Sequence, residues 1–239
     1  MSSLFISDLH LEDTRPDALQ WLLGLLSGPA RSSEALYILG DLFEYWIGDD
    51  AASPAALELA RRTRELVAAG VSCHFIHGNR DFLLGESYAA AAGLKLLPET
   101  CVVDLYGTPT LLLHGDTLCS DDVEYQAVRR QTRAPAWQAT VLAMPVEQRQ
   151  RMAAEARDAS RKYTGSAAAG IMDVNQTAVV DAFREHAVQR MIHGHTHRPA
   201  VHRHDLGGGV LGERIVLADW YTHGSYLEVS ADGARTIDL

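Results

Sequence analysis

The chain has 239 residues, 47% hydrophobic and 22% charged, which is typical of one ordinary globular domain with a substantial core. A net charge of −10 argues against a nonspecific nucleic-acid binder, because such proteins are usually basic. The three cysteines form no CxxC pair and no apolar run approaches about 20 residues, so we expect neither a disulfide framework nor a membrane-spanning helix.

Strand and helix patterns alternate through the first half of the chain. Short apolar runs predict strands over 4–6, 36–39, 73–76, 102–105 and 110–113. Longer amphipathic stretches predict helices over 17–26, 54–69 and 83–92, with Pro16 before the first and Gly70 and Gly93 after the other two. A helix over 175–186 and strands over 191–192, 201–204, 215–218 and 226–229 follow, so the order predicts an α/β sandwich with mixed sheets.

Residues 122–170 have a helical pattern without a strand signal, which indicates an insertion into a core formed by 1–121 and 171–239. Between Arg129 and Lys162 there are eight basic and three acidic residues, a net charge of +5 that leaves −15 for the rest of the chain. The insertion is either an amphipathic hairpin packing on its own core or a cap that holds an anionic, partly apolar ligand. A cap of this charge could also touch an anionic membrane surface.

Five short polar clusters carry the chemistry, and four of them follow an apolar run. They are Asp8-Leu9-His10, Gly40-Asp41, Gly78-Asn79-Arg80-Asp81, His114-Gly115-Asp116 and Gly194-His195-Thr196-His197. Alternate residues of an extended segment point the same way, so we expect Asp8 and His10 to share one metal. Mixed carboxylate, amide and imidazole ligands suit Mn²⁺, Fe²⁺ or Zn²⁺ better than Ca²⁺ or Mg²⁺. Asp41 is the natural bridge between two ions that clamp a phosphate.

The order of these clusters resembles the calcineurin-like metallophosphoesterase superfamily, which implies a four-layer αββα sandwich and a dinuclear metal centre. The general pattern of that superfamily has His after Gly-Asn, where this chain has Arg80. A guanidinium stays charged and cannot protonate a leaving group, but it can neutralise a phosphate through two hydrogen bonds. The departure therefore favours cleavage of a diphosphate over cleavage of an alkyl phosphoester.

Longer strings resemble one family of lipid A pathway hydrolases within this superfamily. They are LFISDLHLE, ALYILGDLFEYWIGDD, FIHGNRDFLLG, LLHGDTLCSDD, IMDVNQTAV and IHGHTHRPA. The resemblance implies water attack on the α-phosphate of UDP-2,3-diacylglucosamine, which releases UMP and 2,3-diacylglucosamine 1-phosphate. It implies one Mn²⁺ held by Asp8, His10, Asp41 and His197, and a second held by Asp41, Asn79, His114 and His195.

The same resemblance places the substrate against Asn79, Arg80, Asp122, Ser160, Thr164 and His195, with Arg80 as the catalytic residue. Relatives have Lys where this chain has Ala167, so Arg161 or Lys162 could supply that cationic contact. His77 and His193 are expected to orient neighbouring ligands. Asp81 and Asp116 either accept hydrogen bonds from ligand imidazoles or cap loops.

For a substrate with two acyl chains, we expect a monomer acting as a peripheral protein at the cytoplasmic face of the inner membrane, without a nucleic-acid partner. Two other functions stay open. One is a different dinuclear metallophosphoesterase, such as a nuclease or phosphodiesterase. The other is a noncatalytic binding scaffold, although all seven candidate metal ligands are present in this sequence.

Overall fold

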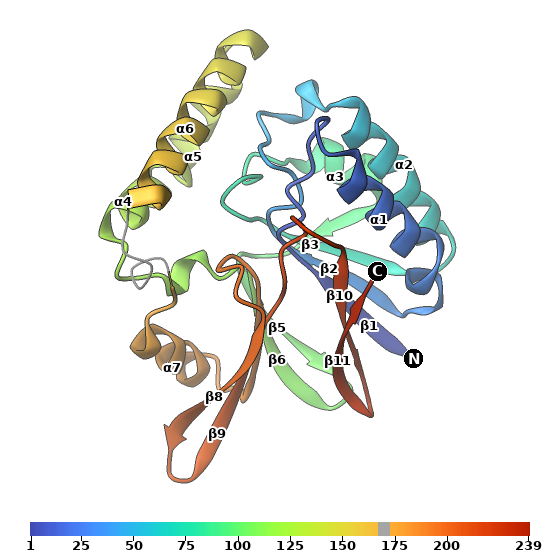
Figure 1. Cartoon of the computed structure of the whole chain (residues 1–239), viewed down its shortest axis with the longest axis vertical. Helices are drawn as coiled ribbons and strands as arrows, with labels where there is room; N and C mark the ends of the chain where they lie inside the picture. The colour runs from blue at the N-terminus through green and yellow to red at the C-terminus, as the bar shows by residue number, and fades with distance from the viewer. Residues whose placement is uncertain (167–172) are drawn as a thin grey trace.

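The computed structural model describes residues 1–166 and 173–239, with the side chains of 164–166 left out. Two mixed β-sheets pack face to face, and helices cover their outer faces (Figure 1). The six-stranded sheet has the order β11 (Gly233–Asp238), β10 (Ser225–Ser230), β1 (Ser2–Ile6), β2 (Ala35–Leu39), β3 (Ser72–Ile76) and β4 (Leu94–Leu96). The five-stranded sheet has the order β5 (Thr100–Leu105), β6 (Thr108–Leu113), β7 (Arg190–His193), β9 (Val210–Val216) and β8 (Ala200–Gly207).

Alternation along the strands builds separate apolar cores on the two faces of each sheet. In β1, Leu4 and Ile6 pack against α1 (Pro16–Ser27), α2 (Pro54–Ala68) and α3 (Glu86–Ala92). Phe5, between them, faces the other way and packs between the two sheets with Leu112 and Ile192. A third core lies between the five-stranded sheet and α7 (Gln176–Glu185), around Phe183. This is the four-layer αββα arrangement expected from the sequence.

Most predicted elements are confirmed, and the differences have local causes. The helix predicted over 83–92 begins only at Glu86, because Leu83 and Leu84 lie in the turn before it, and it ends at Gly93 with φ of 73°. Strands β4 and β11 were not predicted. The first has three residues, and the second is an exposed edge strand with little apolar content, so neither has the pattern that marks a buried strand.

The segment after β6 forms three helices, α4 (Val123–Thr132), α5 (Pro135–Leu142) and α6 (Val146–Ser166), which stand apart from the layers (Figure 1). We call these helices the cap. Asp122 starts α4 by accepting a hydrogen bond from the backbone N–H of Tyr125. Division of the chain at 122 and 170 into core and cap stays a prediction. Within the described residues, no helix combines the length and the apolar content that a membrane crossing requires.

Arginines attach the cap to the core on two sides. Arg129 of α4 donates to Asp116 at 2.7 Å, and Arg133, at the C-terminal end of that helix, donates to the carbonyl of Gly78 at 2.8 Å. On α6, Arg149 pairs with Asp50 and Arg157 pairs with Glu44. The excess positive charge of the insertion is therefore largely paired with acidic residues of the core. This pairing favours neither the hairpin that packs on its own core nor the cap that holds an anionic ligand over the other.

Candidate dinuclear metal centre and substrate cavity

The candidate metal ligands gather where the carboxyl ends of five strands meet. Strands β1, β2 and β3 are parallel neighbours in one sheet, and β6 and β7 are parallel neighbours in the other. Parallel strands end at the same edge, so loops that follow them come together there. The backbone N–H of His195 donates to Asp8 at 2.9 Å, and His114 Nδ1 donates to the carbonyl of Leu39 at 2.8 Å. These two bonds join the ligand loops of one sheet to those of the other.

Most of these ligand loops have an unusual backbone. Five of the seven candidate ligands have positive φ, between 50° and 69°, namely Asp8, His10, Asp41, His195 and His197. Residues other than glycine rarely adopt this backbone conformation, and those that do are often found in functional sites, where the strain is part of the mechanism. The expected extended geometry of Asp8 and His10 is therefore wrong. The two side chains do converge, but they do so through left-handed backbone at both positions.

The first group of candidate ligands surrounds His10. Its Nε2 lies 3.4 Å from Nε2 of His197 and 3.9 Å from Oδ2 of Asp41. Nε2 of His197 lies 3.4 Å from Oδ1 of Asp8. Nδ1 of His10 donates to Oε2 of Glu44 at 2.7 Å, so the neutral ring presents a lone pair at Nε2.

The second group surrounds the amide oxygen of Asn79. His114 Nε2 and His195 Nδ1 each lie 2.9 Å from Asn79 Oδ1. His114 Nε2 is also 3.7 Å from Oδ1 of Asp41. Since Nδ1 of His114 already donates to Leu39, the neutral His114 ring turns a lone pair toward these oxygens, an arrangement that a cation would stabilise.

Asp41 lies between the two groups, with Oδ2 toward His10 and Oδ1 toward His114. Close packing of glycines makes this possible. A Cβ added to Gly78 would collide with Oδ1 and the backbone nitrogen of Asp41, and one added to Gly40 would collide with the backbone of Gly78. The geometry is that expected of a bridging carboxylate, and its role as a metal bridge stays a prediction.

Buried polar atoms in the site fit a divalent metal. Asp8 is fully buried, and its Oδ1 has no hydrogen-bond partner in the described protein, which is costly unless a cation contacts it. Oxygen and imidazole nitrogen atoms from Asp8, His10 and His197 lie within 4.8 Å of one another, as do those from Asp8, Asp41 and His114. Asp8 therefore reaches both groups, where the sequence assigned it to the first alone.

Charges within the site shift its pKa values in opposite directions. Burial alone would raise the pKa of Asp8, but the nearby imidazoles, His197 above all, lower it. Burial alone would lower the pKa of His114, but the charges of Asp41 and Asp8 raise it. The acidic side chains thus stabilise positive charge within the candidate metal centre, as a cation-binding site requires.

The residues expected to support the ligands act mainly on the backbone. Asp81 accepts N–H groups of Gly78 and Leu42, at 2.8 and 2.7 Å, so it caps loops and binds no imidazole. Asp116 instead accepts from the side chains of Tyr125 and Arg129, so it ties α4 to the site rather than capping a loop. His77 and His193, which were expected to orient neighbouring ligands, also bind backbone atoms. The His77 ring donates to the carbonyl of Leu84, and the His193 ring donates to the carbonyl of Gly194.

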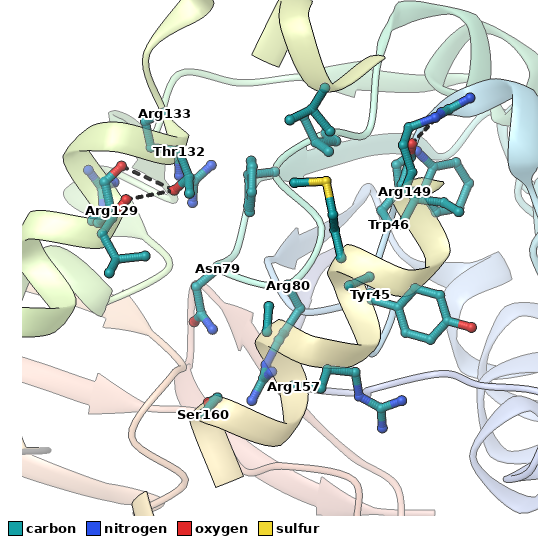
Figure 2. Close-up of a pocket in the computed structure, with 18 of the residues that line it drawn as sticks. Tyr45, Trp46, Asn79, Arg80, Arg129, Thr132, Arg133, Arg149, Arg157 and Ser160 are labelled. Carbon is teal, nitrogen blue, oxygen red and sulfur yellow. Dashed lines mark hydrogen bonds between the residues drawn. The ribbon is translucent and has the colours of Figure 1, made fainter. Parts of the chain in front are cut away.

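Two cavities meet at the candidate metal centre. A polar cavity of about 580 Å³ is lined by the ligands His10, Asp41 and Asn79 among others. An apolar cavity of about 290 Å³ runs between the core and the cap. Six residues line both, namely Glu44, Asn79, Arg80, Tyr125, Arg157 and Ser160. Figure 2 shows Asn79, Arg80 and Ser160 toward one side of the apolar cavity and Trp46 and Arg149 toward the opposite side.

The predicted substrate contacts lie along these cavities. Asp122 and His195 line the polar cavity, and the Nε atom of Arg80 is buried with no hydrogen-bond partner among the described residues. One oxygen of Asp122 caps α4 and accepts the hydroxyl of Tyr163 at 2.9 Å, so it is partly committed to the cap. The side chain of Thr164, and all of Ala167, lie outside the described residues.

Sequence reasoning missed several residues that contact a candidate ligand, Glu44 and Tyr221 among them. Glu44 accepts from His10, and its position three residues after Asp41 in the same loop was the available signal. Tyr221 stacks on His10 with ring centroids 5.1 Å apart and an interplanar angle of 12°. Nothing in the sequence near Tyr221 pointed to this contact, because it depends on the packing of the loop before β10.

Known proteins match this chain over nearly its full length. The family model for calcineurin-like phosphoesterases matches residues 1–199. A UDP-2,3-diacylglucosamine hydrolase of Edwardsiella ictaluri is 49% identical, with 100% of this chain and 92% of that protein covered. One from Stenotrophomonas maltophilia is 50% identical, with coverage of 98% and 96%. A solved archaeal phosphodiesterase, 13% identical, covers both chains fully with a TM-score of 0.51, which supports the fold alone.

Proposed function

The chain belongs to the calcineurin-like phosphoesterase family, and on this premise we propose that it hydrolyses the pyrophosphate bond of UDP-2,3-diacylglucosamine in lipid A biosynthesis. The products would be UMP and 2,3-diacylglucosamine 1-phosphate. One observation supports this substrate above all. An apolar cavity fit for acyl chains shares Asn79 and Arg80 with the polar cavity that contains the candidate metal ligands. A single molecule with acyl chains beside a diphosphate would fill both.

We propose that the metals are two Mn²⁺ ions, one held by Asp8, His10, Asp41 and His197 and the other by Asp41, Asn79, His114 and His195. When bound, such ions supply positive charge for the phosphate and lower the pKa of water. The family implies divalent metal, and the mixed oxygen and nitrogen donors suit Mn²⁺, with Fe²⁺ or Zn²⁺ as the other possibilities.

The protein's own residues position the diphosphate and balance its charge. Water forms a new bond to the α-phosphorus, the bond to the bridging oxygen breaks, and the sugar 1-phosphate leaves with that electron pair. Arg80 lies where the two cavities meet, so its guanidinium can neutralise the leaving phosphate through charge-assisted hydrogen bonds. A phosphate leaving group needs no proton at neutral pH, so a general acid at the position of Arg80 is unnecessary.

The sugar and acyl parts would contact the cap. Ser160 lines both cavities and Asp122 lines the polar one, so both can meet the glucosamine. Trp137 and Met152 line the apolar cavity, where the acyl chains would be shielded from water. We further propose that the chain works as a monomer at the cytoplasmic face of the inner membrane, held there peripherally by its lipid substrate.

Turnover of UDP-2,3-diacylglucosamine with and without Mn²⁺ tests the substrate. Hydrolysis in ¹⁸O-labelled water tests the bond that breaks, with the label expected in UMP. Label in the lipid phosphate would contradict attack at the α-phosphorus. Faster cleavage of bis-p-nitrophenyl phosphate or DNA than of the UDP-linked lipid would favour a general phosphodiesterase or nuclease.

A further inference from the structure

One contact between the cap and the candidate metal centre passes through a carboxylate. We propose that Glu44 and Arg157 form a positioning pair, in which Arg157 of α6 holds Glu44 and Glu44 holds His10 so that its Nε2 faces the first metal position. The inference rests on the proposed function, since it assigns to the substrate cap a second task in supporting the metal centre. Neither residue need touch the reacting atoms.

Each oxygen of Glu44 has a different partner. Oε2 accepts from Nδ1 of His10 at 2.7 Å, and Oε1 accepts from Nε of Arg157 at 3.0 Å. Both are charge-assisted or carboxylate–imidazole hydrogen bonds, the stronger kinds found in proteins. The side chain of Glu44 is 13% exposed and that of His10 is 2% exposed, so neither bond is readily exchanged for water.

Other contacts fix both ends of this chain of side chains. The backbone N–H of Glu44 donates to the carbonyl of Leu11 at 3.0 Å, which ties the loop after β2 to the loop that carries His10. Arg157 also lies 3.5 Å from a carboxylate oxygen of Glu12, and its guanidinium lies 5.4 Å from the ring centre of Tyr45. The guanidinium is therefore held from three sides, and it can hold Glu44 in turn.

Two other arginines of this region reach the core in other ways. Arg133 binds the carbonyl of Gly78, and Arg149 binds Asp50 and the carbonyl of Ile47. Arg157, by contrast, has a carboxylate partner that also accepts a hydrogen bond from a candidate ligand imidazole. Glu44 and Arg157 also line both cavities, so this pair lies at the boundary between the lipid and metal regions.

The test is Mn²⁺ affinity of the full chain without substrate, measured by calorimetric titration and by electron paramagnetic resonance. Arg157→Gln should raise the dissociation constant of one of the two Mn²⁺ sites by about fivefold or more, and Glu44→Gln by about 10- to 100-fold, as is usual for groups that orient metal ligands. Loss of a positive charge near a cation would by itself tighten binding. Weaker binding in Arg157→Gln therefore separates positioning from electrostatics.

Arg151→Gln is the matched control, because it removes the same charge from an exposed position of α6. Its Mn²⁺ affinity should equal that of the wild type or be slightly higher. Arg157→Lys, which keeps the charge but not the planar guanidinium, should fall between wild type and Arg157→Gln. This variant also provides the test should Arg157→Gln not fold.

Hydrogen exchange of α6 provides the reciprocal measurement, since coupling acts in both directions. Mn²⁺ should slow amide exchange in α6 of the wild type and have little effect on it in Arg157→Gln. Unchanged or tighter Mn²⁺ binding in Arg157→Gln would overturn the positioning pair and leave the proposed function intact. A wild-type chain that binds no Mn²⁺, Fe²⁺ or Zn²⁺ would overturn both.

Discussion

Ala153→Phe should shorten the space available to the acyl chains. Ala153 lies on α6 and lines the apolar cavity of about 290 Å³ between the cap and the core. A phenylalanine side chain is larger than that of alanine by roughly 100 Å³, so the ring would occupy about a third of this cavity. Of the seven candidate metal ligands, Asn79 alone lines this cavity, so the metal centre should be largely unaffected.

The expected loss follows from the buried length of the acyl chain. Roughly 100 Å³ corresponds to about four methylene groups, and burial of each contributes about 0.8 kcal/mol. Exclusion of about four methylenes therefore costs about 3 kcal/mol, or roughly a 100-fold loss in kcat/KM for a long-chain substrate. A substrate with acetyl groups in place of long acyl chains should be hydrolysed by the variant and the wild type at similar rates.

The assay compares kcat/KM for long-chain and acetyl substrates in wild type, Ala153→Phe and Ala154→Phe. Ala154 is exposed on the same helix, so its substitution controls for effects of phenylalanine on α6 itself. An equal loss of kcat/KM on both substrates would show that the phenylalanine ring disturbs the metal centre rather than the binding of the acyl chain. Undiminished activity on the long-chain substrate would refute the assignment of this cavity to acyl chains.

Asp41→Ala should abolish turnover and leave the circular dichroism spectrum unchanged. Removal of metal from the wild type with a chelator should also abolish turnover until Mn²⁺ is restored. Residual turnover by the variant would argue against a bridging carboxylate. Gly78→Ala should abolish Mn²⁺ binding, because the added Cβ collides with Asp41. Gly24 lies in open space on α1, so Gly24→Ala should raise the free energy of unfolding in urea by about 0.5–1 kcal/mol. Glu44 has a folded pKa of about 2 against an ordinary value of 4.5, so in the metal-free chain it contributes stability above about pH 4.5 that is lost as the pH falls toward 2. Urea unfolding at pH 6 and pH 3 should therefore show a smaller acid loss in Glu44→Gln than in the wild type, and an equal loss would contradict this pKa.

The strands and the site loops could be predicted because each carries its own local signal. An apolar run followed by a polar cluster marks a buried strand that ends at a functional edge, as for β2 and Asp41. Both sheets and the convergence of the candidate ligands follow from repetition of this pattern. The same signal is absent from the exposed edge strand β11, whose pairing with β10 depends on tertiary context.

Details that depend on backbone angles or distant contacts could not be predicted. Nothing in the residue types of Asp8 and His10 reveals φ values of 55° and 50°, since the strain is sustained by bonds to other loops. Likewise, the positive charge of the cap was visible in the sequence, but its partners were not. Glu44 lies 113 residues before Arg157 in the sequence, so only the fold shows that they pair.

The position of the cap in the chain has a consequence for how such enzymes can diversify. Strands β6 and β7 are adjacent and parallel, and the whole cap lies within the single connection between them. Lengthening that connection changes no strand pairing, and the entropy of closing a longer loop grows only slowly with its length. New helices could therefore be exchanged at this one junction to accept a different molecule, while the reaction centre built by the sheets is inherited unchanged.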